Sequence, residues 1–410
     1  NLEALKALLP RYEGRVKCIY IDPPYNTGNE GWVYNDNVND PKIKRWLGEV
    51  VGKEGEDLTR HDKWLCMMYP RLKLLQKLLA DDGVIFISID DNELFTLKFI
   101  CDEIFGTSNY VSMITRPTGT HTGITNKAIV GESDYILVYA KNLDAMSIDG
   151  LPLQDKDTKI YDMEDERGRF LIRPLRRTGG ENRREDRPNM FFAIKAPDGS
   201  EVFPIGPTGY ESGWICNPDG YRYFEQEGRI FWKKIENGDT VKWQVYQKFY
   251  LEDKKKAVSN LWNDIDGNKK ATRDVRDIFN DDSIKFDFPK PIALIERILR
   301  LDSSSNMIVL DSFAGSGTTA HAVLNMNKAD GGHRKFILVE MMDYADSITA
   351  ERVKRVIRGY GEGKNAVEGT GGNFSFYDLG EPLLVGDCLN EAVAPEKIRE
   401  YIWFMETKQP

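Results

Sequence analysis

Four consecutive residues near the start of the chain, Asp22-Pro23-Pro24-Tyr25, combine a carboxylate, a rigid turn and an aromatic ring. The apolar run at 16–21 that precedes them predicts a short buried strand. The two prolines end this strand, because proline cannot donate a hydrogen bond to a neighbouring strand and restrains the residue before it to extended backbone. We therefore expect these side chains at the C-terminal end of a strand, where open α/β sheets bind ligands.

An exocyclic amino group of a nucleic-acid base fits this arrangement. The carboxylate of Asp22 and the carbonyl of Pro23 are two adjacent hydrogen-bond acceptors, and an amino group offers two N–H donors. Tyr25 adds a flat face on which a base can stack. The alternative is an ordinary turn, since Asp-Pro commonly ends a strand.

A second group of residues, much later in the chain, predicts a nucleotide site. A strand at 307–310 leads into the turn Asp311–Thr319, then a helix, then a strand that ends at Glu340. Gly315 and Gly317 let a ligand approach the backbone closely, and the helix N-terminus favours a carboxylate or phosphate. Glu340 is placed to accept hydrogen bonds from two ribose hydroxyls. Two glycines instead of three, and no P-loop lysine, favour S-adenosylmethionine over a pyrophosphate; a tight turn without a cofactor is the alternative.

Periodic apolar patterns supply the elements that would hold both groups at one edge of a sheet. Helices are expected at 2–9, 61–80, 92–105, 291–301, 320–326 and 344–358. Strands are expected at 16–21, 84–89, 110–115, 135–140, 307–310 and 335–339, with a strand-like run at 374–377. The alternation of strands and helices predicts an α/β fold.

Two polar segments adjoin the first group. Residues 29–60 are rich in Gly, Asn and Asp, and predict either a lid over the site or an insertion. Asp90-Asp91-Asn92-Glu93 follow a predicted strand and open a helix. We expect these acids to cap the helix, although they could instead face the site.

From 116 to 285 helical periodicity fades, and arginines gather in one stretch that holds only three acids, at 181, 185 and 186. The eight arginines are Arg167, Arg169, Arg173, Arg176, Arg177, Arg183, Arg184 and Arg187. Arginine forks suit phosphates and guanine edges, so we expect the cluster to contact DNA; a solvated surface is the alternative. The aromatic residues between 221 and 250 are expected to form a core.

Composition places the chain among soluble globular proteins. The 410 residues carry a formal net charge of −9, which does not exclude a local basic face for DNA. We find no apolar run long enough to span a membrane and no signal peptide. Five scattered cysteines suggest free thiols in a reducing compartment, and no Cys/His spacing suggests zinc or another metal.

Five strings together resemble the β-class DNA amino-methyltransferases, and in particular the Mod subunits of Type III restriction-modification enzymes. They are Ile21–Asn29, Val84–Glu93, Tyr135–Lys141, Phe288–Pro291 and Asp311–Ala320. An initial Asp in the first motif resembles the adenine-N6 type; cytosine-N4 enzymes usually begin it with Ser. The Gly-Asp pair usual before the segment at 1–5 is absent, so we expect part of a longer protein whose sheet lacks one strand.

The resemblance implies a site-specific DNA methyltransferase with a Rossmann-like sheet, helices on both faces and an inserted β-rich target-recognition domain. It implies catalytic roles for Asp22, Pro23, Pro24 and Tyr25. It implies S-adenosylmethionine binding by Lys290, Pro291, Asp311, Phe313, Ala314, Gly315, Ser316, Gly317, Thr318 and Glu340. The expected partners are double-stranded DNA, a restriction (Res) subunit and a second copy of the chain, in a prokaryotic cytoplasm. The rival functions are an N4-cytosine DNA methyltransferase, an RNA methyltransferase and a catalytically silent DNA-binding specificity subunit.

The order of the motifs divides the chain into four predicted parts. The catalytic half covers 1–115 and the cofactor half 286–360. A strand hairpin, to about 141, and the recognition domain lie between them at 116–285. A C-terminal extension covers 361–410.

Overall fold

The computed structural model describes residues 1–27, 55–119, 129–150, 153, 155–237, 240–252, 257–281, 283–284, 286–385 and 388–407. Most of the predicted lid or insertion lies outside the described residues. The chain divides into two compact units. The first consists of Asn1–Gly150 and Val258–Pro410, and the second of Leu151–Ala257.

A six-stranded sheet forms the centre of the first unit, in the order β12-β11-β1-β2-β4-β3. The first four strands of that order run parallel, whereas β4 is antiparallel to β2 and β3 is antiparallel to β4. The strands are β1 (Val16–Ile21), β2 (Leu79–Ile89), β3 (Tyr110–Pro117), β4 (Ser133–Ala140), β11 (Ile308–Asp311) and β12 (Lys335–Leu338). The sheet confirms the predicted α/β fold and the β3–β4 hairpin.

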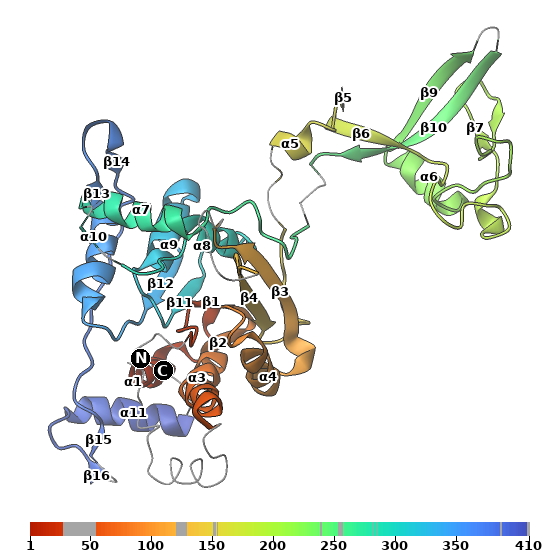
Figure 1. Ribbon diagram of the computed structural model, residues 1–410. Helices are drawn as coiled ribbons and strands as arrows, with labels where there is room; N and C mark the ends of the chain where they lie inside the picture. The colour runs from red at the N-terminus through yellow and green to blue at the C-terminus, as the bar shows by residue number, and fades with distance from the viewer. Residues whose placement is uncertain are drawn as a thin grey trace. The chain divides into compact units, whose positions relative to one another are not determined.

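Helices cover both faces of this sheet (Figure 1). On one face, the helices α1 (Leu2–Tyr12), α3 (Gly55–Leu78) and α4 (Leu94–Phe105) bury their apolar stripes against β1 and β2. On the other face lie α8 (Ile292–Leu299), α9 (Thr318–Asp330) and α10 (Glu351–Arg358). The continuous apolar strands are those expected of a sheet buried on both faces.

Three local predictions differ from the structure. The strand predicted at 84–89 begins at Leu79, which pairs with Val16 across an irregularity in the β1–β2 register. The helix predicted at 344–358 starts as the π-helical turn Ala345–Ala350 before α10. The run at 374–377 forms no strand in this described segment, since no neighbouring strand is there to pair with it.

The second unit has a sheet and a core of its own. Its sheet runs in the order β5-β6-β10-β9, with antiparallel pairs throughout. The strands are β5 (Met163–Asp165), β6 (Gly168–Pro174), β9 (Ile230–Asn237) and β10 (Thr240–Tyr250), with α6 (Pro218–Gln226) packed nearby. Trp214 and Tyr221 are buried in its core. The prediction that the aromatic residues at 221–250 form a core is confirmed for Tyr221 and Tyr250, whereas Tyr223 is 57% exposed.

This unit is narrower than the predicted segment 116–285, because β3 and the residues after 257 pack on the first unit. Thr115 N donates to Asn260 O at 2.8 Å, and Arg116 Nη2 donates to Asn268 Oδ1 at 2.8 Å. Asn268 begins α7 (Asn268–Phe279), which packs on α10.

The remaining elements are short or peripheral. They are α5 (Asp155–Thr158), β7 (Ile194–Lys195), β8 (Glu201–Val202), β13 (Gly359–Tyr360), β14 (Val367–Glu368), β15 (Leu384–Val385), β16 (Cys388–Leu389) and α11 (Pro395–Thr407). Among the helices that the structure describes, none combines the length and the apolar character that a bilayer crossing requires.

Candidate active site

The two groups of residues that the sequence singled out meet at one edge of the sheet. Strands β1 and β11 are parallel neighbours in which Cys18 pairs with Val309 and Ile19 with Leu310. Asp22 follows the last residue of β1, and Asp311 is the last residue of β11. Parallel strands present their carboxyl ends at the same edge, so the Asp-Pro-Pro-Tyr turn and the glycine turn border one region.

Lys290 links these two turns directly. Its Nζ donates to Asp22 Oδ1 at 2.6 Å, to Asp22 Oδ2 at 2.7 Å and to the Tyr25 hydroxyl at 2.9 Å. Its backbone oxygen accepts a hydrogen bond from Thr318 Oγ1 at 3.2 Å. The Lys290 side chain is only 6% exposed and that of Asp22 23% exposed. The ammonium therefore lies in the Asp22 turn, although the family resemblance implied a role in cofactor binding.

Helix α3 supports the Asp-Pro-Pro-Tyr turn through a hydrogen bond. The indole of Trp64 donates to Pro24 O at 2.7 Å. Lys290 Nζ lies 4.8 Å from the centroid of the Tyr25 ring. Burial, and then the nearby Asp22 charge, raise the pKa of the Tyr25 hydroxyl well above its ordinary value. Tyr25 therefore stays a neutral hydroxyl whose ring faces a cation.

The glycine turn needs its glycines. Gly317 precedes α9 with a φ of 80°, and a Cβ there would lie 3.1 Å from Thr349 O. Gly315 has a φ of 52°, and its oxygen accepts from Thr349 Oγ1 at 2.6 Å. Side chains are disfavoured at such φ values, so the backbone of the turn stays bare for a ligand.

Asp311 supports this turn from inside the protein. Its carboxylate accepts hydrogen bonds from Phe313 N at 3.1 Å and from Thr319 Oγ1 at 2.5 Å. Burial raises the pKa of Asp311 to about 7, with further contributions from the charges of Asp22 and Glu340. Asp311 is 3% exposed, and the adjacent Ala314 and Phe313 are also buried. These three residues thus shape the turn from within.

Glu340 is anchored where the sequence placed it, one residue past Val339. Its Oε2 accepts from Gly315 N at 2.8 Å, and its Oε1 accepts from Met341 N at 2.8 Å and Met342 N at 3.0 Å. Both lone pairs of Oε1 are thus engaged, whereas Oε2 keeps one for a further donor. Glu340 borders a cavity of about 460 Å³, within the size range of small-molecule sites. The cavity is also lined by Met341, Met342, Asp343, Ala345, Asp346, Phe376 and Asp378.

These features fit a nucleoside with an amino-acid tail. The anchored Glu340 carboxylate suits ribose hydroxyls, and the bare turn at the start of α9 suits a carboxylate. The sequence did not predict that Phe376 and Asp378, in the C-terminal part of the chain, would line this cavity. No local pattern placed that part of the chain beside Glu340.

Glu93 corrects the expectation that the acids at 90–93 act as helix caps. Its side chain makes no capping hydrogen bond and is completely buried. Glu93 Oε1 accepts from the Asn26 amide, directly after Tyr25, and lies 2.6 Å from His61 Nδ1. Asn26 has a φ of 59°, so the amide–carboxylate contact helps to hold a disfavoured backbone. One feature of the sequence could have predicted this role for Glu93. It follows a buried strand, β2, whose carboxyl end lies at the same edge of the sheet as that of β1.

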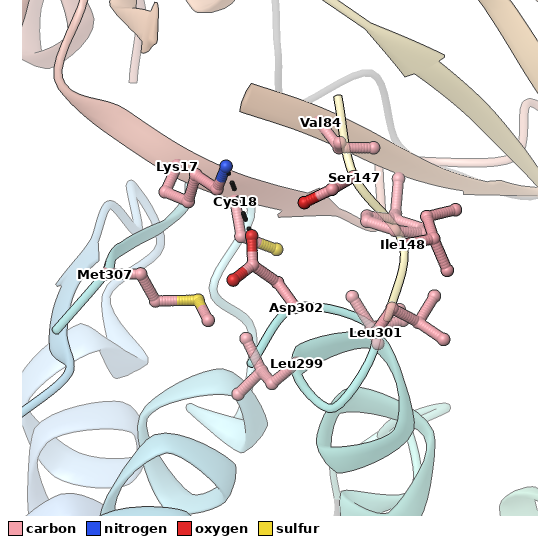
Figure 2. A pocket seen from close by; sticks show the side chains of 11 residues that line it. Lys17, Cys18, Val84, Ser147, Ile148, Leu299, Leu301, Asp302 and Met307 are labelled. Carbon is pink, nitrogen blue, oxygen red and sulfur yellow. Dashed lines mark ion pairs between the residues drawn. The ribbon is translucent and has the colours of Figure 1, made fainter. Parts of the chain in front are cut away.

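A second cavity lies at the opposite, amino-terminal part of the strands and is a packing feature (Figure 2). It measures about 20 Å³, room for about one water molecule, and its lining is mostly apolar. At its border, Lys17 Nζ forms ion pairs with Asp82 at 2.5 Å and with Asp302 at 3.2 Å. Neither predicted group contributes to this cavity.

The predicted arginine cluster lies in the second unit, in the turn between β5 and β6, on β6 and in the segment that follows β6. Three of its members already have carboxylate partners: Arg167 pairs with Glu252, Arg184 with Glu211 and Arg187 with Glu181. Arg183 lies over the Tyr210 ring, Arg173 lies over the Phe249 ring, and Arg169 donates to backbone oxygens at 158 and 161.

Arg176 and Arg177 form no ion pair with any carboxylate among the described residues. Arg176 Nη1 donates to Arg177 O, and Arg177 Nε donates to Gly180 O. Within the described part of the chain neither guanidinium is in ion-pair contact with a carboxylate, although the pKa of Glu181 is lowered by Arg187 and also by the nearby charge of Arg177.

Comparison with known proteins agrees with this geometry. A family model described as DNA methylase matches residues 16–351. The StyLTI Mod subunit of a Type III restriction-modification enzyme from Salmonella typhimurium is 35% identical over 87% of this chain and 56% of its own length. The EcoPI Mod subunit from Escherichia phage P1 is 32% identical over 83% of this chain and 56% of its own. This chain thus spans about half the length of these relatives.

A shorter relative is covered more fully. The Type II methyltransferase M.KpnI from Klebsiella pneumoniae is 35% identical over 83% of this chain and 78% of its own length. The matched segment contains the Asp-Pro-Pro-Tyr turn, Lys290, the glycine turn and Glu340. This chain, which has the described sheet and both turns, belongs to the DNA methylase family.

Proposed function

We propose that this protein transfers a methyl group from S-adenosylmethionine to N6 of an adenine in double-stranded DNA, as the modification subunit of a restriction-modification system. One observation carries the proposal: a nitrogen already lies where the target amino group would bind. Lys290 Nζ, with N–H donors, contacts both Asp22 oxygens and lies over the Tyr25 ring. An adenine amino group at this position would find the Asp22 carboxylate as an acceptor, and the Pro23 carbonyl follows it directly in the chain.

The residues of the Asp22 turn would activate that amino group. A base inside a duplex cannot reach this edge of the sheet, so the target adenine is flipped out of the helix and stacks on Tyr25. Asp22 and the Pro23 carbonyl would accept hydrogen bonds from the two N6 hydrogens and draw the nitrogen lone pair out of conjugation with the ring. Asp22 would take up the N6 proton that the methylated nitrogen releases and pass it to water. The incoming amino group would displace the Lys290 ammonium from the Asp22 carboxylate. The gain comes from positioning and preorganised acceptors.

The residues around the glycine turn would hold the methyl donor. S-adenosylmethionine, when bound, supplies an electrophilic methyl group. Glu340 Oε2 would accept a hydrogen bond from a ribose hydroxyl, and the backbone of Phe313 to Gly317 would receive the methionine end at the start of α9. The choice of adenine over cytosine rests on the family resemblance, in which an initial Asp, here Asp22, is typical of the adenine-N6 type.

The decisive experiment is Asp22→Ala. Transfer of labelled methyl groups to plasmid DNA should be abolished, whereas affinity for S-adenosylmethionine should stay within about twofold, because Asp22 does not line the Glu340 cavity. Asp91→Ala, an exposed acid after the neighbouring strand, is the control and should keep full transfer. Wild-type transfer by the Asp22 variant would refute the proposed mechanism. Absence of transfer by the wild type with intact DNA binding would favour a silent specificity subunit.

The arginine cluster is proposed to contact the DNA backbone. Replacing Arg176 and Arg177 by Gln should weaken DNA binding and reduce the slope of log affinity against log salt by roughly 1 to 2. Arg184→Gln is the control, since Glu211 already neutralises that charge. An unchanged salt slope in the double variant would assign the cluster to a solvated surface.

Partners follow from the relatives. Two relatives are Mod subunits of Type III restriction-modification enzymes, and we propose that this chain likewise works with a restriction (Res) subunit, as a homodimer, in the cytoplasm where its DNA is. Light scattering of the purified protein, alone and with the Res subunit, tests both assemblies.

A further inference from the structure

A fully buried arginine lies beneath the glycine turn. Arg352, on α10, is 1% exposed. Its Nη1 donates to Ser316 Oγ at 2.7 Å, to Thr318 Oγ1 at 3.0 Å and to Ser316 O at 3.3 Å, and its Nη2 lies 3.4 Å from His321 Nδ1. The family resemblance assigned no role to this residue.

The charge of Arg352 has no counter-ion within the described residues. All of its hydrogen-bond partners are neutral groups, and its Nε has no hydrogen-bond partner. Burial, and then the Arg352 charge, lower the pKa of His321 to about 3, so the imidazole is neutral. Asp274 attracts the guanidinium only at longer range. A buried charge without an ion partner is costly, and proteins normally pair or neutralise it.

The position of the charge indicates what neutralises it. Ser316 belongs to the glycine turn, and Thr318 is the first residue of the thirteen-residue helix α9. The N-terminus of α9 adds a partial positive charge at the same place. A buried cation and a helix N-terminus converge on this turn, while the two carboxylates that hydrogen-bond to the turn and to α9, Asp311 and Glu340, are engaged by those hydrogen bonds. The arrangement favours a small anion on the turn.

We propose that Arg352 is a positioning residue whose buried charge is neutralised by the carboxylate of the cofactor's methionine end, through Ser316 and Thr318. This inference rests on the proposed function. Under this inference, Arg352 raises the affinity for the cofactor only through the cofactor's carboxylate. The effect passes through a low-dielectric interior, where a charge is screened far less than at a surface.

The test compares two nucleosides that differ only in that carboxylate. Calorimetry measures the affinity of the protein for S-adenosylhomocysteine and for its decarboxylated form, which keeps the ammonium group. Arg352→Gln removes the charge and keeps an amide donor. It should weaken S-adenosylhomocysteine binding by about 10- to 100-fold, and the decarboxylated nucleoside by less than about threefold. Arg358→Gln, an exposed position of the same helix, should change neither.

Arg352→Lys is a second test variant, which keeps the inference testable if Arg352→Gln does not fold. It keeps the charge on one donor, so S-adenosylhomocysteine binding should fall by less than about 10-fold and binding of the decarboxylated nucleoside should not change. Equal losses for the two nucleosides in either variant would mean that Arg352 only supports the turn, and would overturn the inference, as would no loss in Arg352→Gln. A wild-type protein that binds neither nucleoside would refute the proposed function itself.

Discussion

Asp311 should give this protein a stability that falls as the pH rises. Burial raises the pKa of its carboxyl from 3.8 to about 7 in the folded protein. The folded state therefore holds more protons than the unfolded state between these two values. The free energy of unfolding must decrease with pH across that window, because stability falls wherever the folded state binds the extra proton. The contribution is complete below about pH 4 and is lost as the pH passes 7.

The size of the effect follows from the two pKa values. Each unit of difference corresponds to about 1.4 kcal/mol, which sets a ceiling of about 4 kcal/mol for the whole window. Between pH 5 and pH 8 the expected loss is about 2–3 kcal/mol, because part of the window lies below pH 5. Asp311→Asn cannot ionise, yet its amide oxygen can still accept from Phe313 N. The variant should lose this pH dependence, whatever its absolute stability.

The measurement is urea unfolding of wild type and Asp311→Asn at pH 5, 6, 7 and 8, without ligand. The difference in unfolding free energy between the two proteins should change by about 2–3 kcal/mol over this range, in the direction that favours the variant at high pH. Asp330→Asn is the matched control: hydrogen bonding to Arg334 lowers the pKa of Asp330, so its contribution changes only below about pH 4. Parallel curves for wild type and Asp311→Asn would refute the reasoning.

Three further substitutions test other contacts of the site. Lys290→Met leaves a partly buried carboxylate without its counter-ion and should lower stability by about 1–3 kcal/mol, seen as a lower urea midpoint; an unchanged midpoint would mean that solvent already screens the pair. Phe376→Ala should weaken S-adenosylmethionine binding by about tenfold if the ring stacks on the adenine in the 460 Å³ cavity, whereas Tyr377→Ala, 84% exposed, should not; equal affinities would remove the tail from the site. Glu93→Ala should slow methyl transfer at unchanged cofactor affinity, because it frees the turn after the catalytic motif, and full transfer would show that the turn holds its shape without this carboxylate.

The sequence predicted the parts of the site that depend on local chemistry. Proline cannot extend a strand, so the turn after residue 21 was fixed by two adjacent residues. Glycine tolerates a φ of 80°, so the turn before α9 was equally visible. The parallel pairing of β1 with β11 then followed from the fold class, and it brings these two turns to one edge.

Contacts between distant segments were not predictable in the same way. The Lys290 ammonium reaches Asp22 across 268 positions, and no local pattern says which side of the glycine turn a lysine will face. Arg352, Arg355 and Arg358 share one short helix, and only packing against α9 decides that the first is buried. Glu93 stood among acids that looked like caps, and its burial depends on the position of Asn26.

The division of the chain into two units separates the chemistry from the arginine cluster. Every contact of the candidate site is made within the unit of 1–150 and 258–410, by residues that strand pairing and helix packing bring together. The unit of 151–257 has a sheet and a core of its own, to which the Asp22 turn contributes no residue. Because closing a long loop costs little more than closing a short one, an insertion after β4 leaves the β1–β11 pairing almost unaffected. Under the proposed function, substitutions in the inserted unit can therefore change which DNA is bound, while the acceptor pair at residues 22 and 23 keeps the same reaction.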